Sequence, residues 1–266
     1  MMRHALSCTL LALSVTISDA TDLHPIVEVE TGYFFGASEN GKWVAAEKAA
    51  KRLPTETTFR IYGLTGEVGE AKGGKPKSIE EPCPDTLEVK LSEKPTDSVI
   101  ALGANWNALP RKARIADSTQ KVYINAVRDF LKARGIKDPK VKMKRILRVD
   151  LDGDGEEEVL LSATNYLSAE EEEVPASSPE GSYSIVLLRR VVAGKLKTQV
   201  IAGEVHANAD HSNAPNYYNV SAVLDLDGDG KLEVVVHSSY YEGGSTTIYR
   251  CQPAKITPVL EVGCGV

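Results

Sequence analysis

The sequence predicts a mainly β protein with some helix, an α+β fold built of antiparallel β-hairpins, and three observations support this class. After residue 138, short hydrophobic stretches alternate with polar residues and are separated by turns rich in glycine and aspartate. Only one long segment has the periodicity of an amphipathic helix. With 42% hydrophobic and 26% charged residues among 266, the chain can form a core, and disorder, collagen, coiled coil and a polytopic membrane protein are poor descriptions of it.

The first twenty residues have the pattern of a secretory signal peptide. Arg3 and His4 give a positive start, residues 5–17 are mostly apolar, and residues 18–20 form a small-x-small exit. The apolar run is too short to span a bilayer comfortably. We therefore expect cleavage near Ala20, a secreted or periplasmic protein, and no membrane span after cleavage.

Residues 21–138 are expected to form an N-terminal mixed α/β part. Strands are predicted where β-branched and aromatic residues cluster, a short helix where alanine, lysine and glutamate do, and loops where glycine and proline do. The expected order is β-rich segments over 26–36, a turn at 38–41 leading into a strand at 42–44, a helix at 45–53, a strand at 59–63, an exposed loop at 66–84 and a strand at 87–91.

The strongest helix prediction covers residues 119–134. Ser118 is placed to cap its N-terminus, and Gly135 followed by Pro139 ends it. The apolar residues that recur at helical spacing and form its core-facing side are Tyr123, Val127, Phe130 and Leu131.

Residues 139–266 are expected to form a β-rich part, with a soft boundary near residue 138. Residues 184–192 and 196–205 predict a hairpin, and alternation predicts a strand at 218–224. The acidic run at 170–173, followed by proline and serine, is typical of a solvated loop.

Two acidic segments of this β-rich part repeat one pattern, Asp-Leu-Asp-Gly-Asp-Gly-x-x-Glu, at residues 150–158 and 225–233. Aspartates at positions 1, 3 and 5 of a tight loop converge, and like charges about 4 Å apart repel by roughly 1 kcal/mol per pair even in water. A hard divalent cation reverses this repulsion, and Ca²⁺ prefers six to eight oxygen ligands in a flexible loop. The predicted ligands are Asp150, Asp152, Asp154 and Glu158 in the first loop and Asp225, Asp227, Asp229 and Glu233 in the second, with the backbone carbonyls of Glu156 and Lys231 as candidates for the seventh position.

Neither loop is an EF-hand. That motif needs a bidentate glutamate at position 12, where this sequence has Leu161 and Val236, and no predicted helices flank either loop. An acidic surface turn without a metal is the plain alternative, since Asp-Gly pairs also make hairpins. It does not explain why four spaced carboxylates occur twice, so we predict two Ca²⁺ sites.

A strand, this acidic loop and a second apolar strand resemble the FG-GAP or VCBS-type repeats of integrin-like β-propellers. The resemblance covers roughly residues 141–166 and 216–250. It implies that each loop binds Ca²⁺ within a hairpin shaped like a propeller blade, with the carboxylates named above as ligands, and that the ion stabilises the blade. Two blades cannot close a propeller, so a complete propeller is not expected.

Three cysteines remain after cleavage, and a disulfide is expected in an exported protein. Cys251 and Cys264 lie close in the sequence and are the favoured pair, whereas Cys83, in a proline-rich loop, is the alternative partner. No cysteine or histidine spacing indicates a zinc site.

Other motifs are weighed and set aside. Residues 36–43 nearly match a phosphate-binding loop, but Trp43 stands where a hydroxyl would bind Mg²⁺, so we expect a hairpin. Tyr240 and Tyr241 precede a glycine turn and either present their rings to a ligand such as a sugar or, as we favour, complete the sheet edge. The histidine-containing set for which an ordinary structural or exposed role is favoured consists of His206, Asp210, His211 and His237.

The charge balance and the motifs together limit the function. The net charge is −6 and no basic stripe is visible, which excludes a nucleic-acid partner. No nucleophile-elbow motif is present. We therefore expect an exported calcium-binding module that binds or scaffolds a protein or carbohydrate ligand, with structural Ca²⁺ and no catalysis. The alternative is a secreted hydrolase whose site lies in residues 21–138 and for which calcium only stabilises the fold.

Overall fold

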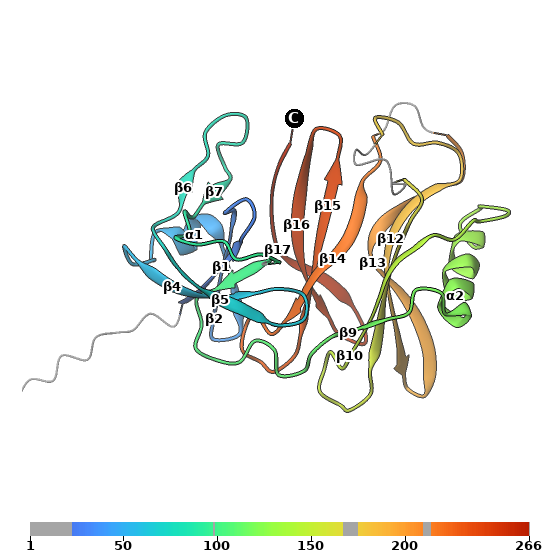
Figure 1. Cartoon of the computed structure of the whole chain (residues 1–266), viewed down its shortest axis with the longest axis horizontal. Coiled ribbons are helices and arrows are strands. Elements are labelled where there is room, and N and C mark those ends of the chain that lie inside the picture. Colours follow the sequence, from blue (N-terminus) through green and yellow to red (C-terminus); the bar gives the residue numbers. More distant parts are fainter. Residues whose placement is uncertain (1–22, 98, 167–174, 210–213, 266) are drawn as a thin grey trace, which may run out of the picture.

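The computed structural model describes residues 23–97, 99–166, 175–209 and 214–265, and within these ranges the chain is mainly antiparallel β-sheet with two helices. The predicted class, mainly β with some helix, is confirmed. Three large sheets lie side by side, and one helix lies outside each outer sheet (Figure 1). The predicted signal peptide, the acidic run at 170–173 and two set-aside residues, Asp210 and His211, lie outside the described ranges.

The first sheet contains six strands from the N-terminal part of the chain. Its predicted hairpin is confirmed, because Asn40 and Gly41 take positive φ angles of 50° and 70° and turn the chain between two paired strands. Residues 36–43 therefore belong to this hairpin. In spatial order the strands are β3 (Lys42–Ala45), β2 (Phe34–Glu39), β1 (Leu23–Glu28), β8 (Ile100–Leu102), β4 (Thr57–Tyr62) and β5 (Glu67–Gly73).

The second sheet contains five strands and includes the predicted long hairpin. This hairpin turns at Ala193 and Gly194, which both take positive φ, and its register runs from Val192–Lys195 to Ser182–His206. In spatial order the strands are β13 (Lys195–His206), β12 (Ser182–Val192), β11 (Glu158–Thr164), β10 (Met143–Val149) and β9 (Arg114–Ala116).

The central sheet, between the other two, buries both of its faces. On β14, Val220 and Val223 contact the second sheet, whereas Ala222 and Leu224 contact the first. A β-bulge between Val220 and Ala222 produces this division, since it shifts the alternation of side chains by one residue. In spatial order the strands are β14 (Tyr217–Leu224), β15 (Glu233–Tyr240), β16 (Gly243–Cys251) and β17 (Ile256–Gly265).

Each helix covers the outer face of an outer sheet (Figure 1). Helix α1 (Ala46–Ala50) is shorter than predicted, and its buried Ala49 packs in the core of the first sheet. Helix α2 (Lys121–Lys132) packs on the second sheet, and the predicted apolar face is confirmed because all four of its residues belong to that core or pack against it.

Helix α2 is shorter at both ends than the predicted range 119–134. The predicted cap at Ser118 is wrong: the helix begins after Gln120, and the side chain of Asp117 instead accepts a hydrogen bond from the backbone N–H of Thr119 at 2.8 Å. At the other end the helix stops at Lys132 instead of Arg134, and the predicted stop at Gly135 is confirmed, since Gly135 takes a φ of 97° and the N–H of Ile136 donates to the carbonyl of Leu131.

The prediction of an exposed loop at 66–84 is wrong in part. Residues 67–73 form β5, which pairs with β4. Small residues (Gly69, Ala71 and Gly73) lie on one face of this strand, and the residues between them are exposed. A small two-stranded sheet follows, made of β6 (Lys77–Ser78) and β7 (Leu87–Glu88), so the strand predicted over 87–91 is shorter than expected. The lysine and glycine content of this segment favoured the prediction of a loop, but an edge strand tolerates both residues.

The favoured disulfide between Cys251 and Cys264 is wrong. The two cysteines lie on adjacent strands, but the register pairs Cys251 with Ile256 near the turn and Cys264 with Gly244 near the far end. At about 3.4 Å per residue, this register separates the two sulfurs by most of the strand length. Cys264 is instead bonded to Cys83, and Cys251 is a buried free thiol.

The division of the chain near residue 138 stays a prediction. Helix α2 and strand β9 precede that residue, yet both pack with the second sheet, whose other strands follow it. No helix among the described residues is both long and apolar enough to cross a membrane.

Candidate metal centre

Both acidic segments are loops that join paired antiparallel strands. The loop at 150–158 joins β10 to β11 in the second sheet, and the loop at 225–233 joins β14 to β15 in the central sheet. Strands flank both loops, as expected for a site that is not an EF-hand.

The first aspartate of each loop folds the loop around its own carboxylate. In the first loop, the two side-chain oxygens of Asp150 accept from the N–H groups of Gly153 (2.6 Å) and Gly155 (3.1 Å). Both glycines take positive φ angles, 82° and 93°, which residues with a side chain rarely adopt. In the second loop Asp225 makes the same two bonds, to Gly228 and Gly230, at 2.7 and 3.0 Å.

The glutamate at position nine closes each loop from the following strand. Oε2 of Glu158 accepts from the N–H of Leu151 at 2.8 Å, and Oε2 of Glu233 accepts from the N–H of Leu226 at 3.0 Å. Both glutamates are the first residue of a strand and are buried. The two loops thus share these hydrogen bonds as well as their sequence pattern, and the second adds one, from the N–H of Asp229 to Oδ1 of Asp227 at 3.3 Å.

In each loop three carboxylates converge closely enough to hold a metal ion. Their ligand oxygens lie within 4.8 Å of one another in both groups. The aspartate at position five joins the group only in the second loop, and the glutamate only in the first. The two groups consist of Asp150, Asp152 and Glu158, and of Asp225, Asp227 and Asp229.

The remaining predicted ligands lie at the edge of these groups. One carboxylate oxygen of Asp154 accepts from the N–H of Glu156 at 2.8 Å, and Asp229 makes the same contact with the N–H of Lys231. Glu233 lies beside the second group, against the guanidinium of Arg250 at 3.5 Å. The ligand role of the Glu156 and Lys231 carbonyls stays a prediction.

The first loop contains a buried oxygen that lacks a partner. Oδ1 of Asp152 is shielded from solvent and makes no hydrogen bond within the described residues. A buried acceptor of this kind costs about 1–3 kcal/mol unless a partner compensates it. A cation among the three carboxylates would supply that partner, so the residues of the first loop fit a bound metal ion.

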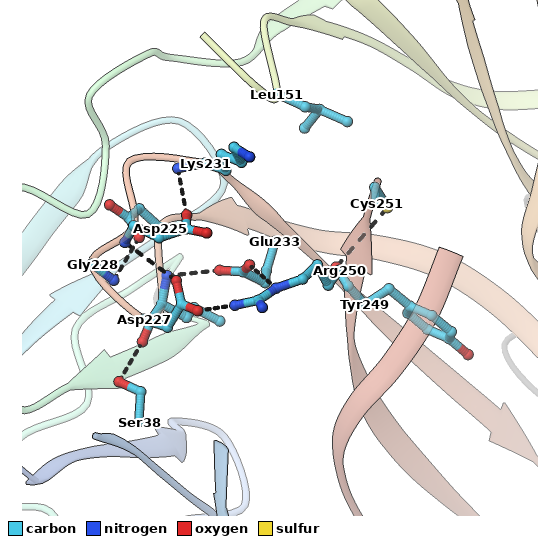
Figure 2. A network of polar contacts seen from close by, with 12 residues as sticks. Ser38, Leu151, Asp225, Asp227, Gly228, Lys231, Glu233, Tyr249, Arg250 and Cys251 are labelled. Carbon is cyan, nitrogen blue, oxygen red and sulfur yellow. Dashed lines mark hydrogen bonds and ion pairs between the residues drawn. The ribbon is translucent and has the colours of Figure 1, made fainter. Parts of the chain in front are cut away.

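In the second loop an arginine lies against the buried carboxylates. Figure 2 shows the guanidinium of Arg250, on β16, directed at the carboxylates of Asp227 and Glu233. These two side chains are 0% and 1% exposed, so their charges require compensation within the protein. Arg250 provides part of it. The first loop has an arginine as well, but Arg111 lies 3.8 Å from Asp150, and Asp152 has no such partner within the described residues.

Burial changes the acidity of these carboxyl groups. It raises the pKa of Glu233 to about 8, against an ordinary value of 4.5, and the hydrogen bond from Leu226 opposes this only in part. Burial also raises the pKa of Asp225 and of Glu158, and neighbouring aspartates add to the effect. A bound cation would stabilise the ionised form of these carboxyl groups and so offset the cost of burying their charge.

The two loops contact each other although they belong to different sheets. The N–H of Leu232 donates to the carbonyl of Leu151 at 2.8 Å. Arg111 links them further, since its guanidinium donates to the carbonyls of Asp150 (2.6 Å) and Gly230 (2.7 Å). A cavity of about 320 Å³ lies between the loops and is bounded by residues of both.

The second loop is also fixed to the first sheet. The hydroxyl of Ser38, on β2, donates to the carbonyl of Leu226 at 2.9 Å (Figure 2). The indole N–H of Trp106 donates to the carbonyl of Asp225 at 2.9 Å, and its ring lies over Gly228. The loops therefore lie where all three sheets meet.

Sequence reasoning found the acidic residues but not the arginines around them. Arg111 and Arg250 reach the loops from positions distant in the sequence, and no spacing rule marks them. Of the histidines set aside, His206 lies 3.3 Å from Glu204, and His237 contacts Thr246.

Comparisons with known protein families, curated proteins and solved structures found no match to this chain.

Proposed function

We propose that the chain is an exported, calcium-binding β-rich protein that acts as a binding or scaffold module, in which Ca²⁺ has a structural role. The observation that carries this proposal is the pair of acidic loops. They share a nine-residue sequence pattern, and the first aspartate of each accepts the same two hydrogen bonds from glycine N–H groups. Their resemblance to FG-GAP or VCBS-type loops supports the same role.

The donor set favours calcium among the metal ions. All side-chain donors in both groups are carboxylate oxygens, which suit Ca²⁺, Mg²⁺ and Mn²⁺ better than softer metals. Mg²⁺ demands a strict octahedron and retains several waters, whereas Ca²⁺ accepts the irregular set of six to eight oxygens that a flexible loop provides. The proposed cofactor is therefore two Ca²⁺ ions, one per loop.

The position of the loops supports a structural role. Each loop connects two strands of one sheet, and the second loop contacts both neighbouring sheets through Ser38 and Leu232. An ion in either loop would neutralise carboxylates that are buried at this junction. Calcium would therefore stabilise the packing of the sheets rather than take part in a reaction.

The two loops are expected to bind calcium unequally. The first has six acidic residues among nine, and a buried oxygen of Asp152 without a partner. In the second, the charge of Arg250 lies against Asp227 and Glu233 and must be displaced or outweighed by an entering cation. We assign the tighter site to the first loop.

Thermal unfolding with and without calcium tests the proposal. Calcium at about one hundred times Kd should stabilise the protein by roughly 2.7 kcal/mol per site, and sites of extracellular modules have Kd values near 10⁻⁴–10⁻³ M. The melting temperature should rise with added calcium and fall with chelator. An unchanged melting temperature, together with no binding heat, would refute the proposal.

Two further parts of this account rest on the sequence. Export rests on the pattern of the first twenty residues, and mass spectrometry of the mature N-terminus tests it. The alternative function, a secreted hydrolase with its site in residues 21–138, stays a prediction.

A further inference from the structure

A second cavity, far from the acidic loops along the strands, opens between the first and central sheets. Its volume is about 240 Å³. Residues at the end of the central sheet near the C-terminus line it, and that end of the sheet can be located in Figure 1. Its walls come from the turn after β1, from the ends of β15 and β16, and from β17.

A chain of hydrogen bonds across the two sheets fixes one wall of this cavity. The hydroxyl of Thr246, on β16, donates to Oε1 of Glu28, at the end of β1. Since that hydroxyl proton is used, Oγ1 of Thr246 accepts from Nδ1 of His237, 3.0 Å away. Nδ1 of the imidazole therefore carries a proton, and Nε2 makes no hydrogen bond within the described residues.

The carboxylate of Glu28 is already satisfied. Its second oxygen accepts from the hydroxyl of Thr31 at 2.5 Å, and Thr31 in turn accepts from the N–H of Tyr33. The side chain of Glu28 is only 12% exposed. It therefore orients the wall of the cavity and offers little to a cationic ligand.

Two other hydroxyl groups at the cavity remain available. Within the described ranges, neither the Ser239 hydroxyl nor the Tyr33 phenol makes a hydrogen bond. The register places Gly244 opposite Ser239 on β16, so that neighbour adds no side chain over the hydroxyl, whereas Tyr217 of β14 lies opposite Ser239 on the other side. Each hydroxyl can both donate and accept, and the imidazole of His237 adds a third polar group to the lining.

The cavity has a fixed outer rim. Cys264, on β17, is bonded to Cys83, and the hydroxyl of Thr86 donates to the carbonyl of Gly263 at 2.7 Å. These two contacts hold the segment around β6 and β7 against β17. The site is thus pre-formed, which reduces the entropy lost when a ligand binds.

The lining restricts the chemistry of a ligand. No lysine or arginine lines the cavity and the carboxylate of Glu28 does, so the lining does not favour an anion. The volume is below the roughly 300–1,000 Å³ typical of sites for drug-sized molecules. The matching ligand is small, uncharged and rich in groups that both donate and accept hydrogen bonds.

We propose that this cavity, bounded by His237, Ser239 and Tyr33, binds a neutral polyhydroxylated ligand of the size of one sugar ring. The inference rests on the proposed binding role of the chain and names its ligand class. It is independent of the acidic loops, so calcium binding and sugar binding can fail separately.

Titration of the full chain by NMR tests this inference. The ¹⁵N-labelled protein, in calcium-containing buffer, is titrated with the methyl glycosides of glucose, galactose, mannose and N-acetylglucosamine. Concentrations should reach about 50 mM, because a small open site supports only millimolar affinity. We expect at least one sugar to shift the amide signals of His237, Ser239 and Gly244 saturably.

Two variants of adjacent serines on β15 provide a matched comparison. Ser239→Val removes a hydroxyl from the cavity and should weaken binding at least about tenfold, as expected for a lost hydrogen bond to a ligand. Ser238→Val alters the opposite face, where Ser238 contacts Ser245, a residue that also borders the cavity, and should weaken binding much less than Ser239→Val does. His237→Gln should also weaken binding.

Three results would overturn the inference. These are no saturable shift with any of the four sugars, saturable shifts confined to residues outside the cavity, or equal affinity in the natural protein and Ser239→Val. If Ser239→Val fails to fold, the pattern of shifts in the natural protein still decides between the outcomes. A protein that binds calcium but no sugar would refute this inference and leave the proposed calcium sites intact.

Discussion

Asp152 and Asp227 occupy the same position in the two loops, yet only Asp227 is paired with an arginine and accepts a hydrogen bond from within its loop, from the N–H of Asp229 at 3.3 Å. The difference arises from Arg250, which reaches the second loop from β16. In the first loop an oxygen of Asp152 is buried without a partner. One side chain from a neighbouring strand therefore sets the charge balance of a site whose own residues are repeated.

The first residue-scale prediction concerns Arg250→Met. In chelator this change should destabilise the protein by about 3 kcal/mol, because it leaves the buried charge of Asp227 without compensation. Added calcium should restore most of the loss, and calorimetry should show tighter binding at the second loop. Chemical unfolding in chelator and in calcium measures both effects.

The matched control is Arg114→Met. Arg114 pairs with Glu157 on the surface and its side chain is 67% exposed, so its loss should cost about 0–1 kcal/mol in either buffer. Equal costs for the two arginine variants in chelator would contradict the role assigned to Arg250.

Asp152→Asn should destabilise the protein in calcium and not in chelator, which is the reverse of the result expected for Arg250→Met. In chelator its stability should stay within about 0.5 kcal/mol of the natural protein, because the substitution breaks no hydrogen bond of Oδ1. In saturating calcium it should lose about 2–3 kcal/mol of ligand-linked stability. Glu156→Gln, whose side chain is exposed, should behave as the natural protein in both buffers. A cost for Asp152→Asn that does not depend on calcium would show that this residue is not a ligand.

Calcium binding should release protons. Burial raises the pKa of Glu233 to about 8, so below that pH its carboxyl group holds a proton that an entering cation displaces. Calcium affinity should therefore rise between about pH 6 and 8, and calorimetry in two buffers of different ionisation enthalpy should detect the released protons. An affinity that is constant over this range would contradict the raised pKa.

The same group sets the pH dependence without calcium. A carboxyl group whose folded-state pKa lies above its ordinary value of 4.5 contributes stability that is complete below that value. The contribution is lost as the pH rises through about 8. In chelator the protein should thus become less stable as the pH rises from about 4.5 to about 8.

At the scale of the elements, local patterns predicted the hairpins well and the pairing of cysteines poorly. Alternating residues and turn residues marked β2–β3 and β12–β13, since both signals lie within the hairpin itself. The disulfide depends on the register of β16 and β17 and on where β6 and β7 dock. Those are tertiary facts, which closeness in the sequence does not contain.

The disulfide yields a prediction for this element. Cys83 and Cys264 are separated by 181 residues, and a bridge closing so long a loop should stabilise the fold by about 4–5 kcal/mol. Cys83→Ser should lower the urea midpoint accordingly, and reductant should have no further effect on this variant. A natural protein whose midpoint is the same before and after reduction would refute the estimate.

At the scale of the whole molecule, the central sheet joins the other two because both of its faces are apolar. Alternation predicted β14, at 218–224, but neither β16 and β17 nor the fact that Val220 and Ala222 face different sheets, since a bulge intervenes. The carboxylates of each candidate metal site were predictable because they lie within nine residues of one another. Arg111, Arg250 and the His237 cavity were not, because each is assembled from segments distant in the sequence.

The most direct test of the central claim is the number of calcium ions bound by the natural protein. Equilibrium dialysis of the full chain, treated first with chelator, followed by elemental analysis, gives this number as a function of free calcium. The account predicts one ion bound at the lower concentrations and a second, through the Arg250 loop, at higher ones. No bound calcium at millimolar free concentrations would contradict it.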